Sequence, residues 1–376
     1  MSQEFLDVIQ NWEALHPIKG GTDPAYIAQL AEVERLVSGQ GYKPHEREYL
    51  LREALTTSSF PYLFGDVLDR ALLATYNAVP PVWMPIVKQS TLKDFRTAYR
   101  FAITDGDQTL PRVYEKGEYL ASNRLEERFS ISLGKYGRQF DISWEAIIND
   151  DLNALQDTPA RMSTAVSRTE HRLVTGLFAG DVGTHTANAN LFEVGVNAVA
   201  TAFSFASLRT GLQHFATLTD DNGEPILARP KYLYLPPALE LLGMQVLSST
   251  NVQWLADADD VTPPAEYGTA NILRNFGLTI IVDPYLPILD TTSDEEGWYL
   301  FCPPSEITSL EVAKLAGHER PEICMKASDK VAVGGGSLIS PMEGDFATDN
   351  IIYRVRHVFG GAAMDWRGCY MGGYAG

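Results

Sequence analysis

The residues best suited to chemistry are scattered along the chain and form no recognisable catalytic set. Asn149-Asp150-Asp151 places two carboxylates side by side. Adjacent residues of a helix do not face one another, so this triplet is typical of a helix end rather than of a metal or general-acid site. Glu170-His171 lacks the His-Glu-x-x-His spacing that brings two ligands onto one helix face, and we interpret it as a polar helix face. His185 has no second histidine beside it, which is typical of a solvated loop residue.

Nucleotide-binding and nucleophile motifs are also missing from the sequence. Gly334-Gly335-Gly336-Ser337 follows a short apolar run but lacks the Lys-[Ser/Thr] of a phosphate-binding loop, which favours a turn. No Gly-x-Ser-x-Gly occurs. Cys302, Cys324 and Cys369 are few and far apart, which argues against a disulfide framework and a zinc site and fits assembly in a reducing cytoplasm. The sequence therefore predicts a protein without catalysis, cofactor or metal.

Length and charge narrow the class of protein further. The chain has 376 residues, which suffice for two or three domains. Hydrophobic residues make up 45% of it and charged residues 21%, which is an ordinary composition for a globular protein. Lys and Arg number 30 against 48 Asp and Glu, so the net charge is -18. Such an acidic chain disfavours sequence-independent binding to nucleic acid and docking on anionic membranes. The sequence also predicts no leader and no membrane-spanning segment.

The N-terminal part of the chain is predicted to be helical. Residues 1–55 indicate a helix, a turn and a second helix, which is either a partner-facing arm or a helical hairpin packed on the core. A further helix is predicted to end at Pro80-Pro81, because proline cannot continue it. The apolar side of this helix consists of Val67, Leu68, Ala71, Leu72 and Tyr76.

From Asp94 onward the apolar period changes to two, which predicts a β-hairpin with a long polar tip. One strand carries Phe95, Tyr99, Phe101 and Ile103 on one face, and the matching strand carries Phe129, Ile131 and Leu133. A two-stranded ribbon is marginal alone in water, so it is either a solvated surface hairpin or an interface with another subunit. The candidate inter-subunit contacts in this hairpin are charged residues: Arg112, Glu115, Lys116, Glu118, Arg124 and Glu126.

The remaining chain is predicted to alternate helices with strands. A helix from Asp157-Thr158-Pro159 to Ala179-Gly180 should be long enough to act as a structural spine. Its apolar stripe consists of Met162, Val166, Thr169, Leu173 and Leu177. Helices at 207–218 and 237–247 with strands at 231–235, 278–283, 298–302 and 307–313 predict an α/β domain over about 200–340. The tail alternates over 351–359 and is expected to turn at Gly360-Gly361.

Six short motifs follow one another between about residue 54 and the end of the chain. They are Ala54-Leu55-Thr56-Thr57-Ser58-Ser59-Phe60-Pro61, Leu72-Leu73-Ala74-Thr75-Tyr76, Tyr136-Gly137-Arg138-Gln139-Phe140, Ala146-Ile147-Ile148-Asn149-Asp150-Asp151-Leu152, Arg229-Pro230-Lys231-Tyr232-Leu233 and Asp365-Trp366-Arg367-Gly368. In order and spacing, they resemble the major capsid proteins of tailed bacteriophages, which have the Hong Kong 97 fold. The nearest subgroup is the head subunit of Mu-like phages, which some phages fuse behind a prohead protease.

This resemblance implies an α+β fold with five parts. They are an N-terminal arm (1–90), an extended β-hairpin loop and its base (91–142), a peripheral domain with a spine helix (143–199), an axial α/β domain (200–340) and C-terminal strands that return to the peripheral domain (341–376). Some members of the fold crosslink a lysine of this loop to a neighbour's asparagine. Lys116 is the obvious donor here, but no motif requires the reaction and we expect no crosslink.

The resemblance implies a structural role in the virion, assembled in the cytoplasm of a bacterial host. The chain would form pentamers and hexamers of itself and enclose double-stranded DNA without sequence-specific contacts. Further implied partners are portal, scaffold or protease, and decoration proteins, with no membrane. An encapsulin-like compartment shell and a soluble α/β enzyme are the alternatives. The enzyme would need a pocket of convergent polar groups, for which the sequence shows no constellation.

Overall fold

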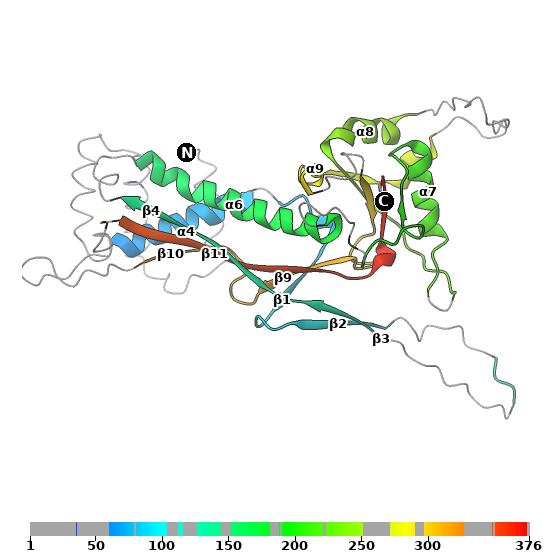
Figure 1. Cartoon of the computed structure of the whole chain (residues 1–376), viewed down its shortest axis with the longest axis horizontal. Helices are drawn as coiled ribbons and strands as arrows, with labels where there is room; N and C mark the ends of the chain where they lie inside the picture. The colour runs from blue at the N-terminus through cyan, green and yellow to red at the C-terminus, as the bar shows by residue number, and fades with distance from the viewer. Residues whose placement is uncertain are drawn as a thin grey trace, which may run out of the picture. The chain divides into compact units, whose positions relative to one another are not determined.

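A computed structural model describes residues 35, 60–78, 80–103, 112–115, 126–143, 152–180, 188, 190–220, 223–250, 271–289, 297–326, 348 and 350–373 (Figure 1). The chain forms two compact units. Unit 1 comprises 1–80, 134–169 and 316–359, and unit 2 comprises 81–133, 170–315 and 360–376. The boundary falls inside α6 (Leu152–Ala179) and inside β11 (Asn350–Ala363), so these two long elements belong to both units.

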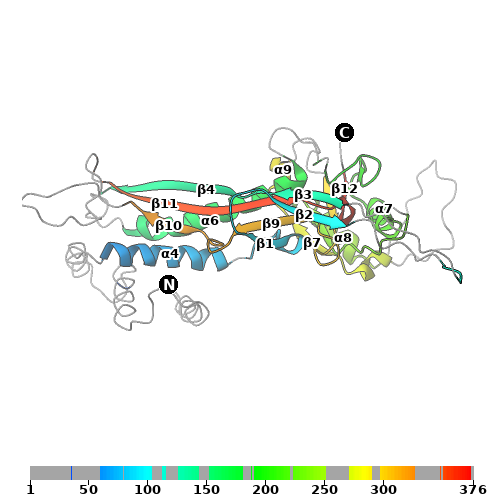
Figure 2. The same ribbon diagram turned by 90° about the horizontal axis from the view of Figure 1, so that it is seen from below.

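In unit 1, β11 lies between β4 (Gly134–Ser143) and β10 (Glu322–Met325) and pairs antiparallel with both. The helix α4 (Phe60–Ala78) runs along these strands, and the backbone N–H of Ile323 donates to Asp69 of α4 at 3.1 Å (Figure 2). The core consists of alternate strand residues and apolar helix residues. It is formed by Leu72, Leu73, Val166 and Val355, with Tyr76, Phe140, Met162 and Ile323 around them.

Unit 2 contains a sheet with strands in the order β5-β12-β8-β6-β7. The pair β6–β7 is parallel and is connected through a helix, α8, as a parallel pair requires, while β8 runs antiparallel to β6 and to β12. This helix and strand alternation confirms the predicted α/β character of the region. The strands are β5 (Ala198–Val199), β12 (Cys369–Gly372), β8 (Trp298–Phe301), β6 (Tyr232–Leu235) and β7 (Thr279–Val282).

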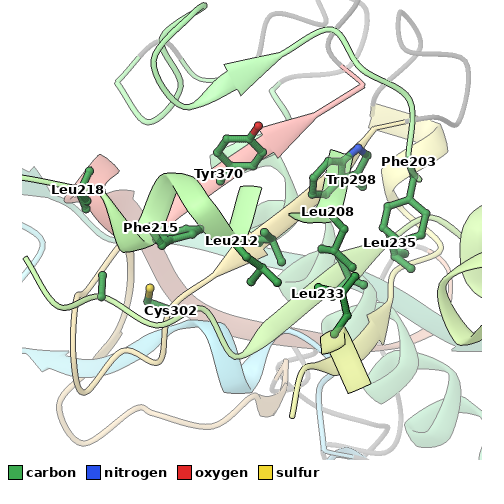
Figure 3. Close-up of a cluster of buried hydrophobic side chains, with 13 residues drawn as sticks. Phe203, Leu208, Leu212, Phe215, Leu218, Leu233, Leu235, Trp298, Cys302 and Tyr370 are labelled. Atoms are coloured by element: carbon green, nitrogen blue, oxygen red, sulfur yellow. The ribbon is translucent and has the colours of Figure 1, made fainter. Parts of the chain in front are cut away.

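Both faces of this sheet are covered. On one face, α7 (Phe205–Ala216) and α8 (Glu240–Ser248) pack on a cluster around Leu233, Trp298 and Tyr370 (Figure 3). On the other face, Phe178 of α6 packs edge-on against Tyr234, Tyr299 and Phe301, with ring centroids 5.0–5.4 Å apart. Burial on both faces explains why β6 and β8 read as continuous apolar runs.

Shorter elements complete unit 2. The strand β1 pairs in parallel with β9, with Lys88 opposite Glu311, and β2 pairs with β3 as a separate two-stranded sheet. Their bounds are β1 (Lys88–Leu92), β2 (Ala98–Ile103), β3 (Glu126–Ile131), β9 (Leu310–Leu315), η1 (Met84–Ile86), η2 (Pro237–Leu239), η3 (Ile272–Phe276), α9 (Leu286–Leu289) and η5 (Trp366–Gly368). Within the described part of the chain, no helix is long and apolar enough to cross a membrane.

Four predictions about local structure were wrong in whole or in part. The helix α6 begins at Leu152, before the predicted start at Asp157. Of its predicted apolar stripe, Val166 is buried and Met162 packs on the core, but Thr169 is exposed, and Ser163, Glu170, Val174 and Phe178 are buried instead. The buried face of α6 is therefore rotated from the predicted one. Glu170 and His171, which we predicted to form a polar helix face, point inward to charged partners. Lys314 Nζ lies 3.5 Å from Glu170 Oε1, and Asp283 Oδ1 lies 3.0 Å from His171 Nε2. The end of α6 at Gly180 was predicted correctly, and Gly180 adopts a positive φ of 91°.

The predicted turn at Gly360-Gly361 is the fourth error, since β11 continues without interruption to Ala363. The glycines serve close packing instead. A Cβ at Gly360 would lie 2.1 Å from the carbonyl oxygen of Ser132, and a Cβ at Gly361 would lie 2.6 Å from Leu177. The predictions at Asn149-Asp150-Asp151, His185 and Gly334–Ser337 lie outside the described residues, as do those for 1–55 apart from Arg35, which is helical.

Candidate inter-subunit interface

The ribbon of β2 and β3 is the most distinctive feature of unit 2, because within the described residues each strand pairs only with the other. The register places Arg100 opposite Phe129 and Phe101 opposite Arg128. Directly opposed residues of an antiparallel pair lie on the same face. The apolar residues of the two strands therefore lie on opposite faces, and the ribbon has an inner face with Phe129 and Ile131 and an outer face with Tyr99 and Phe101.

Two ion pairs attach the inner face to the rest of unit 2. Arg100 of β2 places Nη2 2.9 Å and Nε 3.0 Å from Glu311 Oε1, which also accepts from Ser90 Oγ at 2.6 Å. Glu127 of β3 lies 3.8 Å from Nη1 of the buried Arg367. The ribbon thus contributes one cation and one anion, and the body of the unit contributes the complementary charges from two nearly buried side chains, Glu311 and Arg367. These two contacts fix the ribbon in one orientation.

Among the residues that the structure describes, the outer face has no such ion-pair partner. Tyr99 is 48% and Phe101 61% exposed, and the guanidinium of Arg128 lies 4.5 Å from the centroid of the Tyr99 ring. Closer to the tip, Arg112 lies 5.1 Å from the ring of Tyr114, whose side chain is also exposed. Exposed aromatic rings stacked with arginine are typical of residues that bind another protein.

The six predicted contact residues are placed unevenly by the structure. Arg112 and Glu115 are exposed, and Glu126 is the first residue of β3, opposite Ile103. Lys116, Glu118 and Arg124 lie outside the described residues. The predicted contacts are all charged and leave out the aromatic outer face, which the alternation of Tyr99 and Phe101 already indicated. They also leave out Arg100 and Glu127, whose partners lie more than two hundred residues away in the sequence.

Unit 2 also holds a buried polar cluster around Asp283, which has no exposed surface. Its Oδ2 accepts from Thr175 Oγ1 at 2.5 Å and from Tyr234 Oη at 2.8 Å, and its Oδ1 accepts from the backbone N–H of Tyr285 at 2.7 Å. Burial alone would raise the pKa of Asp283, but the contact with His171 and these hydrogen bonds outweigh it and lower the pKa. The cluster joins α6 to the sheet, and we assign it a structural role.

The described residues contain no group of three or more histidine, cysteine or acidic side chains that could hold a metal ion. With the geometry established, comparison with known proteins identifies the family. A family model described as phage capsid protein matches residues 126–372, about two thirds of the chain. The chain belongs to the phage capsid protein family.

Membership in this family confirms the fold class and the function that the resemblance implied. The capsid protein is an α+β chain of the Hong Kong 97-like fold, and it is the major capsid protein of an icosahedral shell. It is a structural, non-catalytic component of the virion. The family therefore sets aside the alternatives of a soluble α/β enzyme and of an encapsulin-like compartment.

The capsid protein is also similar to solved capsid structures, at low identity. A chain of Gordonia phage Cozz is 12% identical with a TM-score of 0.47, over 79% of this chain and 87% of that one. The capsid of a native GTA particle, computed with C5 symmetry, is 10% identical with a TM-score of 0.49, over 79% and 91%. A chain of Microbacterium phage Oxtober96 is 9% identical with a TM-score of 0.46, over 78% of this chain and 90% of that one. No residue role rests on these similarities, and no curated protein matches the chain.

Proposed function

We propose that copies of this capsid protein assemble as pentamers and hexamers into the shell of a tailed phage head, and that the outer face of the β2–β3 ribbon binds a neighbouring subunit. Support for pentamers comes from the GTA capsid, whose structure was computed with C5 symmetry. The observation that carries the ribbon's role is the division of its two faces. The inner face is ion-paired to its own subunit, while Tyr99 and Phe101 on the outer face are 48% and 61% exposed.

The marginal stability of an uncovered ribbon connects this division to assembly. A two-stranded ribbon is marginally stable in water unless another surface covers it. When a neighbour covers them, the side chains of Tyr99 and Phe101 each bury roughly 150–250 Å² of surface. The ion pairs of Arg100 and Glu127 hold the ribbon in place before a neighbour binds, so less conformational entropy is lost on association.

The five-part organisation implied by the sequence forms part of this proposal. We assign the arm to 1–90, the extended loop and its base to 91–142, the peripheral domain to 143–199, the axial domain to 200–340 and the returning strands to 341–376. We place the chain nearest the Mu-like head subunits. The other proposed partners are portal, scaffold or protease, decoration proteins and packaged double-stranded DNA. The shell would enclose this DNA without sequence-specific contacts, and a net charge of -18 on each chain disfavours tight binding to it.

The test is assembly of the purified full-length protein, together with its scaffold or protease if it needs one. The variant Tyr99→Ser/Phe101→Ser removes both rings, and we expect the yield of closed particles in electron micrographs to fall at least about tenfold. Leu227→Ser is the matched control, because Leu227 is 84% exposed and lies outside the ribbon. Shells from the double variant in wild-type yield would overturn the role of the ribbon. A wild-type chain that stays monomeric with every partner present would overturn the shell.

A further inference from the structure

The outer side of the helix α8 carries large apolar side chains among its polar ones, although a surface helix usually presents a polar face to solvent. Its inner side packs on the sheet, where Gly243 is buried so closely that a Cβ would lie 2.5 Å from Leu235. Its outer side carries Leu241, which is 79% exposed, and Met244, which is 47% exposed. Large apolar side chains that gather in the open on one helix face are typical of a contact surface, and no partner covers these two within the described residues.

The neighbouring element η3 extends this apolar surface. Ile272 and Phe276, one helical turn apart, are both 55% exposed. Asn271 fixes η3 to the end of α8, since its Nδ2 donates to Val246 O at 2.7 Å and to Ser249 O at 2.9 Å. Its Oδ1 accepts from the backbone N–H of Leu273, which begins η3. The exposed sides of α8 and η3 thus form one rigid surface, which we call the α8/η3 surface: Leu241, Met244, Ile272 and Phe276.

The charges around this surface indicate which partner covers it. Each chain carries a net charge of -18, so copies of the chain repel one another over most of their surfaces. The elements α8 and η3 contain a single acid, Glu240, and a single base, Arg274. Neither forms an ion pair within the described part of the chain. A second copy can therefore approach here without repulsion and offer an arginine to Glu240 and a glutamate to Arg274.

We propose that the α8/η3 surface binds a second copy of this chain, as a subunit contact separate from the ribbon. The inference rests on the proposed shell, which requires each subunit to contact several neighbours at once. The apolar centre supplies the affinity, and the Glu240 and Arg274 pairs set the orientation of the copies. A partner of other composition is less suited, because an acidic partner would meet Glu240 and a basic partner would meet Arg274 without compensation.

The experiment measures association of the full chain by sedimentation velocity across a concentration series. We expect Leu241→Glu/Met244→Glu to raise the concentration needed for assembly by roughly a hundredfold, because each copy buries two charges in an apolar contact. Leu227→Glu, a charge at a leucine of similar exposure outside the surface, should assemble as wild type does. Circular dichroism of dissociated subunits should show all variants folded, since Leu241 and Met244 point away from the core.

Exchanging the two charges distinguishes a contact between copies from an effect on folding. We expect Glu240→Arg and Arg274→Glu each to weaken assembly several-fold, and the double variant to recover most of it, because the pair is restored between copies. Assembly of Leu241→Glu/Met244→Glu at the wild-type concentration, or no recovery in the charge exchange, would overturn the proposal. Wild-type protein that forms no oligomer would instead overturn the proposed shell, so the two failures are distinguishable.

Discussion

Arg100 and Glu311 form an ion pair in which two nitrogens of one guanidinium contact the same carboxylate oxygen, at 2.9 and 3.0 Å. Glu311 is nearly buried, with 3% of its side chain exposed, whereas Arg100 is 36% exposed. The pair joins the free ribbon to β9, a strand inside the body of unit 2. Because a buried carboxylate without a cation is costly, this ion pair determines where the ribbon leaves the subunit.

Removing the cation tests this relationship. Arg100→Met leaves Glu311 buried with the Ser90 hydroxyl as its remaining side-chain donor among the described residues, and we expect the free energy of unfolding to fall by about 2 kcal/mol. Arg100→Met/Glu311→Met should recover much of that loss, because no unpaired charge stays behind. Urea unfolding of dissociated subunits measures both values. Arg128→Met is the control on the exposed outer face and should change stability by less than about 0.5 kcal/mol; an equal loss in Arg128→Met would contradict the prediction.

Gly360 offers a second test of how the ribbon is held. Ser132, which follows β3 directly, approaches Gly360 so closely that an added methyl group would lie 2.1 Å from its carbonyl oxygen. We expect Gly360→Ala to lower the free energy of unfolding by about 3 kcal/mol or more, since backbone must move. Gly176→Ala is the control, because Gly176 lies in α6 with open space around its Cα. It should raise stability by about 0.5–1 kcal/mol. Thermal unfolding separates these outcomes, and similar melting temperatures would contradict the prediction.

The sequence allowed most helices and strands to be predicted, because apolar periodicity depends on local burial. The period-two pattern at Tyr99 and Phe101 predicted β2, and Gly180 correctly marked the end of α6. The pairing of Arg100 with Glu311 could not be predicted, because nothing local shows which acid a distant arginine will meet. The same limit explains Glu170 and His171: a charged pair on a helix predicts exposure unless its distant partners are known.

The Asp283 cluster makes the free energy of unfolding depend on pH in a defined direction. The pKa of Asp283 is lowered in the folded state, so its carboxylate stabilises the fold fully above the unfolded pKa of about 4. This contribution is lost as the pH falls through the folded pKa. Asp283→Asn should cost about 2–3 kcal/mol at pH 7, because Thr175 and His171 lose a charged acceptor. Urea unfolding from pH 7 to pH 2.5 should show the gap between wild type and variant narrowing below about pH 4. A gap independent of pH would show that Asp283 is not ionised in the folded protein.

The three thiols are expected to react at very different rates. Burial, and then the charge of Glu306, raises the pKa of Cys302 to about 12, and burial with nearby charges raises the pKa of Cys369 well above its ordinary value. The thiolate is the nucleophile, so at pH 8 about one Cys302 in ten thousand is reactive. Cys324 is partly exposed on β10. Iodoacetamide should therefore modify Cys324 in the native protein and all three residues in urea, as peptide mass spectrometry would show. Modification of Cys302 as fast as Cys324 under native conditions would mean that the sheet of unit 2 opens at the end of its central strand, β8.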